Sequence, residues 1–404
     1  MQRSIMHIDL DTFFVSCERL LDPSLVGKPV LVGGVRDRGV VSACSYEART
    51  YGVHSAMPMR MARQLCPEAI VIKGNSGIYS KYSNMVTDII KEGAPLYEKA
   101  SIDEFYIDLT GMDAFFGCYK WAQELRERII KETNLPISFG LSTSKVVSKI
   151  STNEAKPNGL IHVKAGLEKE FLAPLSIKKI PMVGDQTYRK LRSMGVEQIK
   201  TVQEMPLELM EKVLGKNGVA IWKKANGLDN SPVIAYHERK SISSSLTFEK
   251  DTINTTYLKK VLATMTEKLA YYLRVGNRLT ACVTVTIRYS DFDTRTRQAR
   301  IPYSANDEVL IKTVMDLFAQ LYQRRVLVRL VGVRFSHLIG GGHQINLFED
   351  SEKLLNLYQA MDNMRNRYGQ DAVKRAITMD TKGVGQFQNP FNGLPPIIPA
   401  HRRN

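Results

Sequence analysis

The sequence has no apolar run long enough to cross a membrane. This holds along all 404 residues, and the start, Met1 to Leu10, lacks the basic-then-apolar order of a signal peptide. We therefore expect a protein without a membrane-spanning segment that works in the cytoplasm.

Cysteine and histidine are scarce and scattered. The five cysteines are odd in number and include no C-x-x-C pair, which argues against a disulfide framework or a zinc site. The seven histidines include no H-E-x-x-H sequence, so a histidine-bound metal is not indicated. The phosphate-binding sequence G-x-x-x-x-G-K-S/T is absent as well. Any metal is therefore expected to have oxygen ligands, and a triphosphate is not expected to bind through a P-loop.

Acidic residues are outnumbered by basic ones. The 41 aspartates and glutamates face 56 lysines and arginines, which gives a formal net charge of +15. Such an excess suits a polyanion, and nucleic acid and an anionic membrane surface fit it equally well. Because 44% of the residues are hydrophobic, the chain can bury several cores, and we expect about two to four domains.

The hydrophobic pattern changes twice along the chain. Up to Gly159, short apolar strands alternate with amphipathic helices, which indicates a mixed sheet with helices. From Phe171 to Trp222, short helical patterns are interrupted by proline and glycine, as in a small helical domain, and residues 225–239 are typical of a linker. From Lys240 the order strand, helix, strand, strand, helix, strand is the split βαβ pattern. The sequence therefore predicts an α+β multidomain fold.

Carboxylates gather where strands are predicted to start or end. Asp9 lies at the end of the strand Ile5 to Leu10, and Asp103 and Glu104 lie in S-I-D-E-F-Y-I-D. Carboxylates at the ends of adjacent strands are a typical way to hold Mg²⁺. Neighbouring strand residues point to opposite faces, so this interpretation needs a turn at Ser101. The alternative is a set of solvated acids at strand ends.

Basic and aromatic residues follow the same strands. Tyr46 and Arg49 in Y-E-A-R, and Lys156 in A-K-P-N-G, offer donors that would suit a triphosphate. Phe13 and Phe14 follow the first acidic strand. Two adjacent aromatic residues are either part of a core or, beside a nucleotide sugar, a steric barrier to a 2′-hydroxyl.

Five motifs together resemble one family. H-I-D-L-D-T-F-F, Y-E-A-R, S-I-D-E-F-Y-I-D, G-L-S-T-S-K and A-K-P-N-G occur in the order and approximate spacing of the Y-family, or translesion, DNA polymerases, and closely resemble the DinB branch. The resemblance covers roughly residues 1–350 and implies a right-hand polymerase with palm, fingers, helical thumb and a split-βαβ little finger. The implied boundaries are 1–18 and 76–165 for the palm, 19–75 for the fingers, 166–232 for the thumb, 233–240 for a linker, 241–340 for the little finger, and 341–404 for a clamp-binding peptide, a helical segment and a disordered tail.

The resemblance also implies roles for single residues. Two Mg²⁺ ions per active site are expected to bind to the residues that match the family's metal ligands, namely Asp9, Leu10 through its carbonyl, Asp103 and Glu104. The incoming nucleotide is expected to meet Phe13, Phe14, Tyr46, Arg49 and Lys156. Of these, Phe14 matches the steric gate against ribonucleotides.

Two further regions are expected to contact DNA. The segment I-P-M-V-G-D-Q-T resembles the thumb's helix-hairpin-helix, in which Gly184 would approach a phosphate. Met182 replaces the usual glycine and Asp185 a commonly basic residue, so a plain helix turn is the alternative. In the little finger, Arg295 and Arg297 are the first candidates for phosphate contacts.

The peptide Q-I-N-L-F is similar to the one with which bacterial polymerases bind the sliding clamp. It follows three glycines, and Gln344, Leu347 and Phe348 are the expected clamp-binding residues.

Taken as a whole, the resemblance implies a monomeric, template-directed DNA polymerase that adds deoxynucleotides to primed DNA, with low fidelity, past damaged bases. The alternatives are an inactive adaptor, against which the retained acidic residues count, and a nucleotidyl cyclase, against which the basic C-terminal domain counts.

Overall fold

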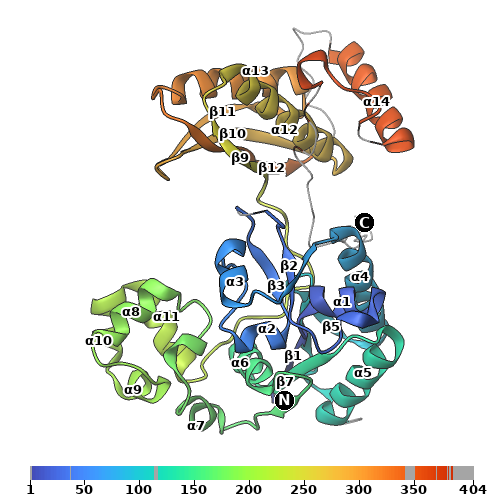
Figure 1. Cartoon of the computed structure of the whole chain (residues 1–404). Coiled ribbons are helices and arrows are strands. Elements are labelled where there is room, and N and C mark those ends of the chain that lie inside the picture. The colour runs from blue at the N-terminus through green and yellow to red at the C-terminus, as the bar shows by residue number, and fades with distance from the viewer. Residues whose placement is uncertain are drawn as a thin grey trace, which may run out of the picture. The chain divides into compact units, whose positions relative to one another are not determined.

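The structure is a computed structural model that describes residues 2–36, 38–112, 117–341, 351–369, 371–379, 381 and 384. The chain divides into two compact units, the first running to His237 and the second beginning at Glu238 (Figure 1). Among the residues described, no helix is long and apolar enough to cross a membrane.

The first unit is built on a five-stranded sheet with the order β5-β6-β1-β7-β8. The strands are β1 (Ile5–Leu10), β5 (Leu96–Lys99), β6 (Glu104–Asp108), β7 (Ile137–Ser142) and β8 (Leu160–His162). β1 pairs antiparallel with both β6 and β7, and all six of its residues are buried. A strand that is covered on both faces usually consists almost entirely of apolar residues, so the buried His7 and Asp9 are exceptions in β1.

Helices cover both faces of this sheet. Residues Met6, Ile8 and Leu10 pack into a core with α1 (Phe13–Leu21), α4 (Ser76–Gly93) and α5 (Cys118–Thr133). The opposite face meets α6 (Lys145–Ala155), where Ser148 Oγ donates to the carbonyl of Ile5 and His7 Nδ1 lies 2.9 Å from Thr152 Oγ1. Asp9 has the same strand parity as Ile5 and His7, so it lies on the α6 face.

Two smaller parts complete the first unit. A three-stranded sheet of order β3-β2-β4 contains β2 (Val30–Gly33), β3 (Val41–Cys44) and β4 (Ile70–Lys73), accompanied by α2 (Tyr46–Thr50) and α3 (Met59–Leu65). The predicted helical domain is confirmed as α7 (Glu168–Leu172), α8 (Asp185–Arg192), α9 (Ile199–Glu204), α10 (Leu207–Leu214) and α11 (Lys216–Ala225). These helices share a core with Val146, Val147 and Ile150 of α6.

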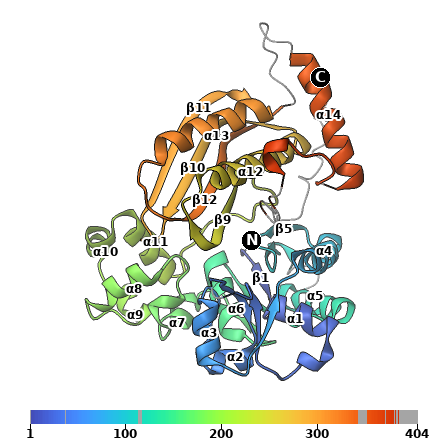
Figure 2. The same cartoon turned by 45° about the horizontal axis from the view of Figure 1, so that its top comes forward.

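The second unit confirms the predicted split βαβ order. It contains β9 (Ser241–Thr252), α12 (Thr255–Val275), β10 (Arg278–Tyr289), β11 (Thr294–Ser304), α13 (Asp307–Leu321) and β12 (Val328–Gly340). The sheet order is β11-β10-β12-β9, so β12 lies between the two strands that α12 connects. Both helices pack on one face of this antiparallel sheet (Figure 2), which leaves the other face outside the hydrophobic core.

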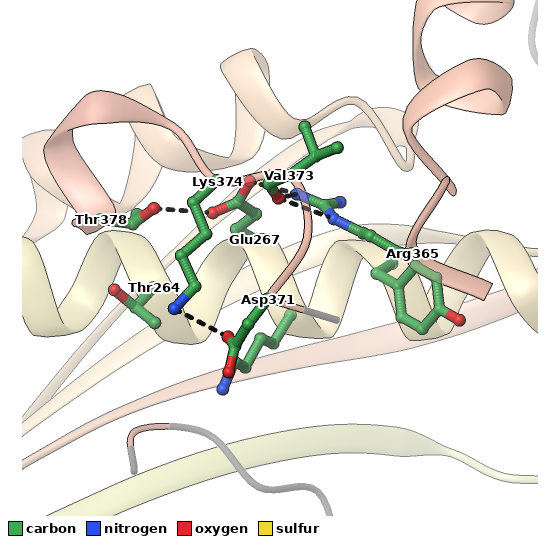
Figure 3. A pocket seen from close by; sticks show the side chains of 9 residues that line it. Thr264, Glu267, Arg365, Asp371, Val373, Lys374 and Thr378 are labelled. Atoms are coloured by element: carbon green, nitrogen blue, oxygen red, sulfur yellow. Dashed lines mark hydrogen bonds and ion pairs between the residues drawn. The ribbon is translucent and has the colours of Figure 1, made fainter. Parts of the chain in front are cut away.

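A C-terminal helix, α14 (Ser351–Tyr368), packs on the second unit through buried ion pairs. Arg274 of α12 lies 2.5 Å from Asp307 and 2.6 Å from Asp362 of α14. Arg365 of α14 binds Glu267 of α12 beside a cavity of about 20 Å³, room for a single water molecule (Figure 3). The helical segment expected within residues 341–404 is α14, which ends at Tyr368. The predicted disordered tail lies outside the described residues.

Candidate active site

Register brings the predicted carboxylates together. Asp9 of β1 is paired directly with Glu104 of β6, so the two side chains lie next to each other on one face of the sheet. The chain bends at 101–103 before β6 begins, which is the turn that the sequence required. Ser101 Oγ accepts from the backbone N–H of Glu104 at 3.0 Å and donates to Asp103 Oδ1 at 2.5 Å. Leu10 joins this bend to β1, because its N–H donates to the carbonyl of Asp103 at 3.0 Å.

Burial raises the pKa values of two of these carboxyl groups, Asp9 and Asp103. The pKa of Asp9 is raised to about 7, because burial and the neighbouring Glu104 and Asp103 raise it by more than Lys156 lowers it. Burial likewise raises the pKa of the Asp103 carboxyl, against a hydrogen bond from Ser101 that lowers it. Lys156 Nζ lies 2.5 Å from Asp9 Oδ1. The site therefore holds more negative charge than its burial tolerates, and it favours a cation.

The donor set fits a hard divalent cation, since Asp9, Asp103 and Glu104 supply only carboxylate oxygens. As the side chains stand, however, no three acidic, histidine or cysteine residues within the described ranges are grouped closely enough to hold an ion. Asp9 is turned toward Lys156, and both oxygens of Glu104 lie 2.6 Å from Lys149 Nζ. An ion would have to displace these ammonium groups.

Asp11 forms hydrogen bonds to the neighbouring segments of the chain, a role that was not predicted from the sequence. Its buried carboxylate accepts from Ser138 Oγ at 2.8 Å, from the backbone N–H of Asn158 at 2.7 Å and from the Tyr46 hydroxyl at 3.4 Å. It thereby ties A-K-P-N-G, the loop that carries Lys156, to the helix that carries Tyr46.

Tyr46 and Arg49 are both presented by the short helix α2. Ser45 begins this helix, because its side chain accepts from the N–H of Ala48. The Arg49 guanidinium lies over the Tyr46 ring at 4.9 Å from its centroid, and Arg49 is otherwise exposed. Burial raises the pKa of the Tyr46 hydroxyl, which therefore stays a hydrogen-bond donor.

The two adjacent phenylalanines have different environments. Phe13 is 2% exposed and belongs to the core, whereas Phe14 is only half-buried. The Phe14 ring stacks on Tyr79 of α4, with centroids 4.4 Å apart and planes 19° apart. The Tyr79 hydroxyl donates to the buried carboxylate of Glu18. Tyr79, which no motif indicated, therefore fixes the ring that the sequence predicted as the steric gate.

In the segment that was expected to form the thumb hairpin, a turn at Met182 leads into α8 (Asp185–Arg192). Met182 has a φ of +83° and is 71% exposed, a backbone conformation that explains why glycine is usual there. Gly184 precedes α8 at its N-terminus, where backbone N–H groups are directed outward. Asp185 is exposed and lies 3.8 Å from Lys178, so its charge is partly compensated.

Strand register separates the little-finger arginines into two groups. Arg295 and Arg297 pair directly with the core residues Ile287 and Val285, so they lie on the helix-covered side of the sheet, exposed because β11 is an edge strand. The opposite, open face carries other arginines and a set of hydroxyl residues. The arginines are Arg288, Arg300 and Arg334, and the hydroxyl residues include Ser243, Ser245, Thr284, Thr286 and Thr296.

The predicted clamp-binding residues Gln344, Leu347 and Phe348 lie outside the described residues.

Comparison with family models covers most of the chain. Residues 8–153 match the impB/mucB/samB family, residues 239–347 its C-terminal domain, and residues 178–229 the thumb domain of DNA polymerase-iota. A DNA polymerase IV of Dehalococcoides mccartyi is 38% identical over 386 residues, 95% of this chain and 99% of that protein. A DNA polymerase IV of Treponema denticola is 32% identical over 391 residues, again 95% of this chain and 99% of the relative.

Solved structures agree with these relatives. A Y-family DNA polymerase chimera matches with a TM-score of 0.74 at 27% identity, over 84% of this chain and all of its own. The insertion ternary complex of Dbh DNA polymerase matches with a TM-score of 0.61 at 26% identity, over 84% of this chain and all of the other. The right-hand polymerase fold and the enzyme class predicted from the motifs are thereby confirmed. The chain belongs to the impB/mucB/samB family, the Y-family of DNA-directed DNA polymerases.

Proposed function

We propose that this polymerase extends primed DNA past damaged template bases with low fidelity, by phosphoryl transfer supported by two Mg²⁺ ions. The observation that carries the proposal is the direct pairing of Asp9 with Glu104 beside Asp103, in a buried group short of positive charge. Primer extension with Mg²⁺ across an undamaged template and across one with an abasic site tests it. Extension of the first template alone would contradict the translesion role.

The proposed Mg²⁺ ligands are the carboxylates of Asp9, Asp103 and Glu104 and the carbonyl of Leu10. When bound, the ions would neutralise charge on the reacting phosphate and on the attacking and leaving oxygens. Lys156 and Arg49 would neutralise the remaining charge of the triphosphate, and Tyr46 would donate a hydrogen bond to it. Asp11 keeps these groups together because it binds both the loop that carries Lys156 and the helix that carries Tyr46.

The domain boundaries follow the same assignment. We take the five-stranded sheet as palm, the three-stranded sheet with α2 and α3 as fingers, α7 to α11 as thumb and the second unit as little finger. The helices of the fingers are five and seven residues long, so they offer little surface to close over a nascent base pair. Such small fingers suit a site that tolerates a distorted template base.

For the little finger, we propose that the open face of the sheet contacts the DNA backbone. Arg288, Arg300 and Arg334 lie there among hydroxyl groups, all suited to phosphate oxygens and none requiring a particular base. Arg295 and Arg297 lie on the helix-covered face, on the edge strand β11. They would therefore contact only DNA that extends past this edge of the sheet.

Replacing Phe14 with alanine should admit ribonucleotides. The half-buried ring that Tyr79 supports would no longer oppose a 2′-hydroxyl, so discrimination between deoxynucleotide and ribonucleotide should fall at least about tenfold. The measurement is the ratio of kcat/KM for matched nucleotides. Tyr79→Phe is the control, because it keeps the stacked ring and should keep the discrimination. Unchanged selectivity in Phe14→Ala would remove this residue from the gate role.

Deleting Gln344 to Phe348 should abolish stimulation by a sliding clamp while leaving synthesis without clamp intact. The peptide's apolar Leu347 and Phe348 would anchor it in a pocket of the clamp. Primer extension with and without clamp measures this, and Leu347→Ala with Phe348→Ala should reproduce the deletion. Equal stimulation of native and deleted chains would show that the docking site lies elsewhere.

We expect the polymerase itself to act as a monomer in the cytoplasm.

A further inference from the structure

Three lysines carried by α6 and its C-terminal end each hold a carboxylate on a different strand of the five-stranded sheet. Lys145 and Lys149 lie one turn apart on this helix, and Lys156 directly follows its last residue. The pairs are Lys145 with Glu98 of β5 at 2.7 Å, Lys149 with Glu104 of β6 at 2.6 Å, and Lys156 with Asp9 of β1 at 2.5 Å.

The middle pair differs from the others in its geometry. Lys149 Nζ lies 2.6 Å from both oxygens of Glu104, with the two side chains 26% and 22% exposed. A divalent cation ligated by Glu104 would need those same oxygens. Lys149 and the cation therefore compete for one carboxylate.

Without a counter-charge, Glu104 would be pushed away from Asp9. The two residues are directly paired across antiparallel strands, and like charges in that position repel each other. Lys149 offsets this repulsion from a fixed point, because α6 is packed along β1 and β7 through contacts such as Ser148 Oγ to the carbonyl of Ile5. Its ammonium keeps the carboxylate where the proposed metal site needs it.

We propose that Lys149 is a positioning residue of the active site, which aims Glu104 at the metal position and releases its oxygens when a divalent cation binds. The inference rests on the proposed two-metal reaction. It implies two effects of opposite sign on removing the ammonium. Cation binding should become tighter, because a competing positive charge is lost, whereas catalysis should become slower, because the carboxylate is no longer aimed.

The experiment uses the full chain and Mn²⁺ alone, without DNA or nucleotide, with free Mn²⁺ measured by electron paramagnetic resonance. Lys149→Met keeps most of the length of the side chain and removes its charge, and should tighten Mn²⁺ binding by about tenfold. In primer extension, the same variant should lower kcat with little change in the KM for deoxynucleotide. A side chain with a merely structural role would give weaker Mn²⁺ binding, because the site would be disordered.

Lys145→Met is the matched control on the same helix. Its partner Glu98 also accepts from the N–H of Ile234 at 2.8 Å and is not among the proposed metal ligands, so Mn²⁺ affinity should not change. In a Glu104→Gln background, Lys149→Met should have no further effect on Mn²⁺ affinity. Unchanged or weaker Mn²⁺ binding by Lys149→Met, in a chain whose native form extends primers, would overturn this proposal alone. Failure of the native chain to extend primers would instead overturn the proposed function.

Discussion

Primer extension should be lost when Asp103 and Glu104 are both replaced by alanine. The two carboxylates are proposed to position the ions that neutralise the transferred phosphate, a contribution of several kcal/mol to the transition state. We therefore expect the rate of extension on an undamaged primed template with Mg²⁺ to fall by at least about a thousandfold. The measurement is single-turnover extension with the four deoxynucleotides.

The matched control lies at the other end of the same strand. Asp108 is the last residue of β6, and its carboxylate accepts a hydrogen bond from the N–H of Thr110 at 2.9 Å. It is not among the proposed metal ligands, so Asp108→Asn should extend primers like the native chain. Both variants should bind primed DNA, because neither change touches the basic little finger. Extension that survives in the double variant would refute the metal site. Tight DNA binding without any extension by the native chain would favour the adaptor.

Replacing Arg365 with methionine should unfold the second unit at much lower denaturant concentration. The Arg365 side chain is 4% exposed and meets Glu267, which is 6% exposed, and its guanidinium also donates to the carbonyl of Val373 at 3.1 and 3.2 Å (Figure 3). Removing one partner leaves the other charge buried without its cation. The expected loss is about 3–5 kcal/mol in the free energy of unfolding. Urea denaturation of the full chain, followed by circular dichroism, measures it.

Arg367 provides the comparison on the same helix. This arginine is exposed, and within the described part of the chain its guanidinium contacts only the ring of Tyr368, at 5.6 Å from the centroid. Arg367→Met should therefore change the free energy of unfolding by less than about 0.5 kcal/mol. Equal effects of the two substitutions would mean that α14 is not held by the buried pair.

Long, strongly patterned elements could be predicted from the sequence. The strand Ile5 to Leu10 has the predicted bounds, because burial on both faces gives an unambiguous pattern. The order of strands and helices after Lys240 is also the predicted one, because long amphipathic repeats such as that of α12 are distinctive. Three short strands were not predicted, namely β4, β5 and β8. They have four, four and three residues, too few to show a period, and neighbouring strands supply most of the reason that they exist.

The residues that the structure brings together at the candidate site could be predicted from the sequence, but several of their contacts could not. Asp9, Asp103 and Glu104 could be recognised because each lies beside an apolar strand, and the bend at Ser101 followed from strand alternation. Tyr79 behind Phe14 could not be predicted, since the two are far apart in sequence and meet only through packing. The face on which Arg295 and Arg297 lie depended on the register of β10 with β11, which a single strand's pattern does not reveal.

The docking of α14 changes what the peptide at 344–348 can reach. β12 ends at Gly340 and α14 begins at Ser351, and both belong to the second unit, so the intervening chain is fixed at both ends. Ten residues between these ends span at most about 36 Å when fully extended. A partner that binds this peptide would thus be held within that distance of the second unit.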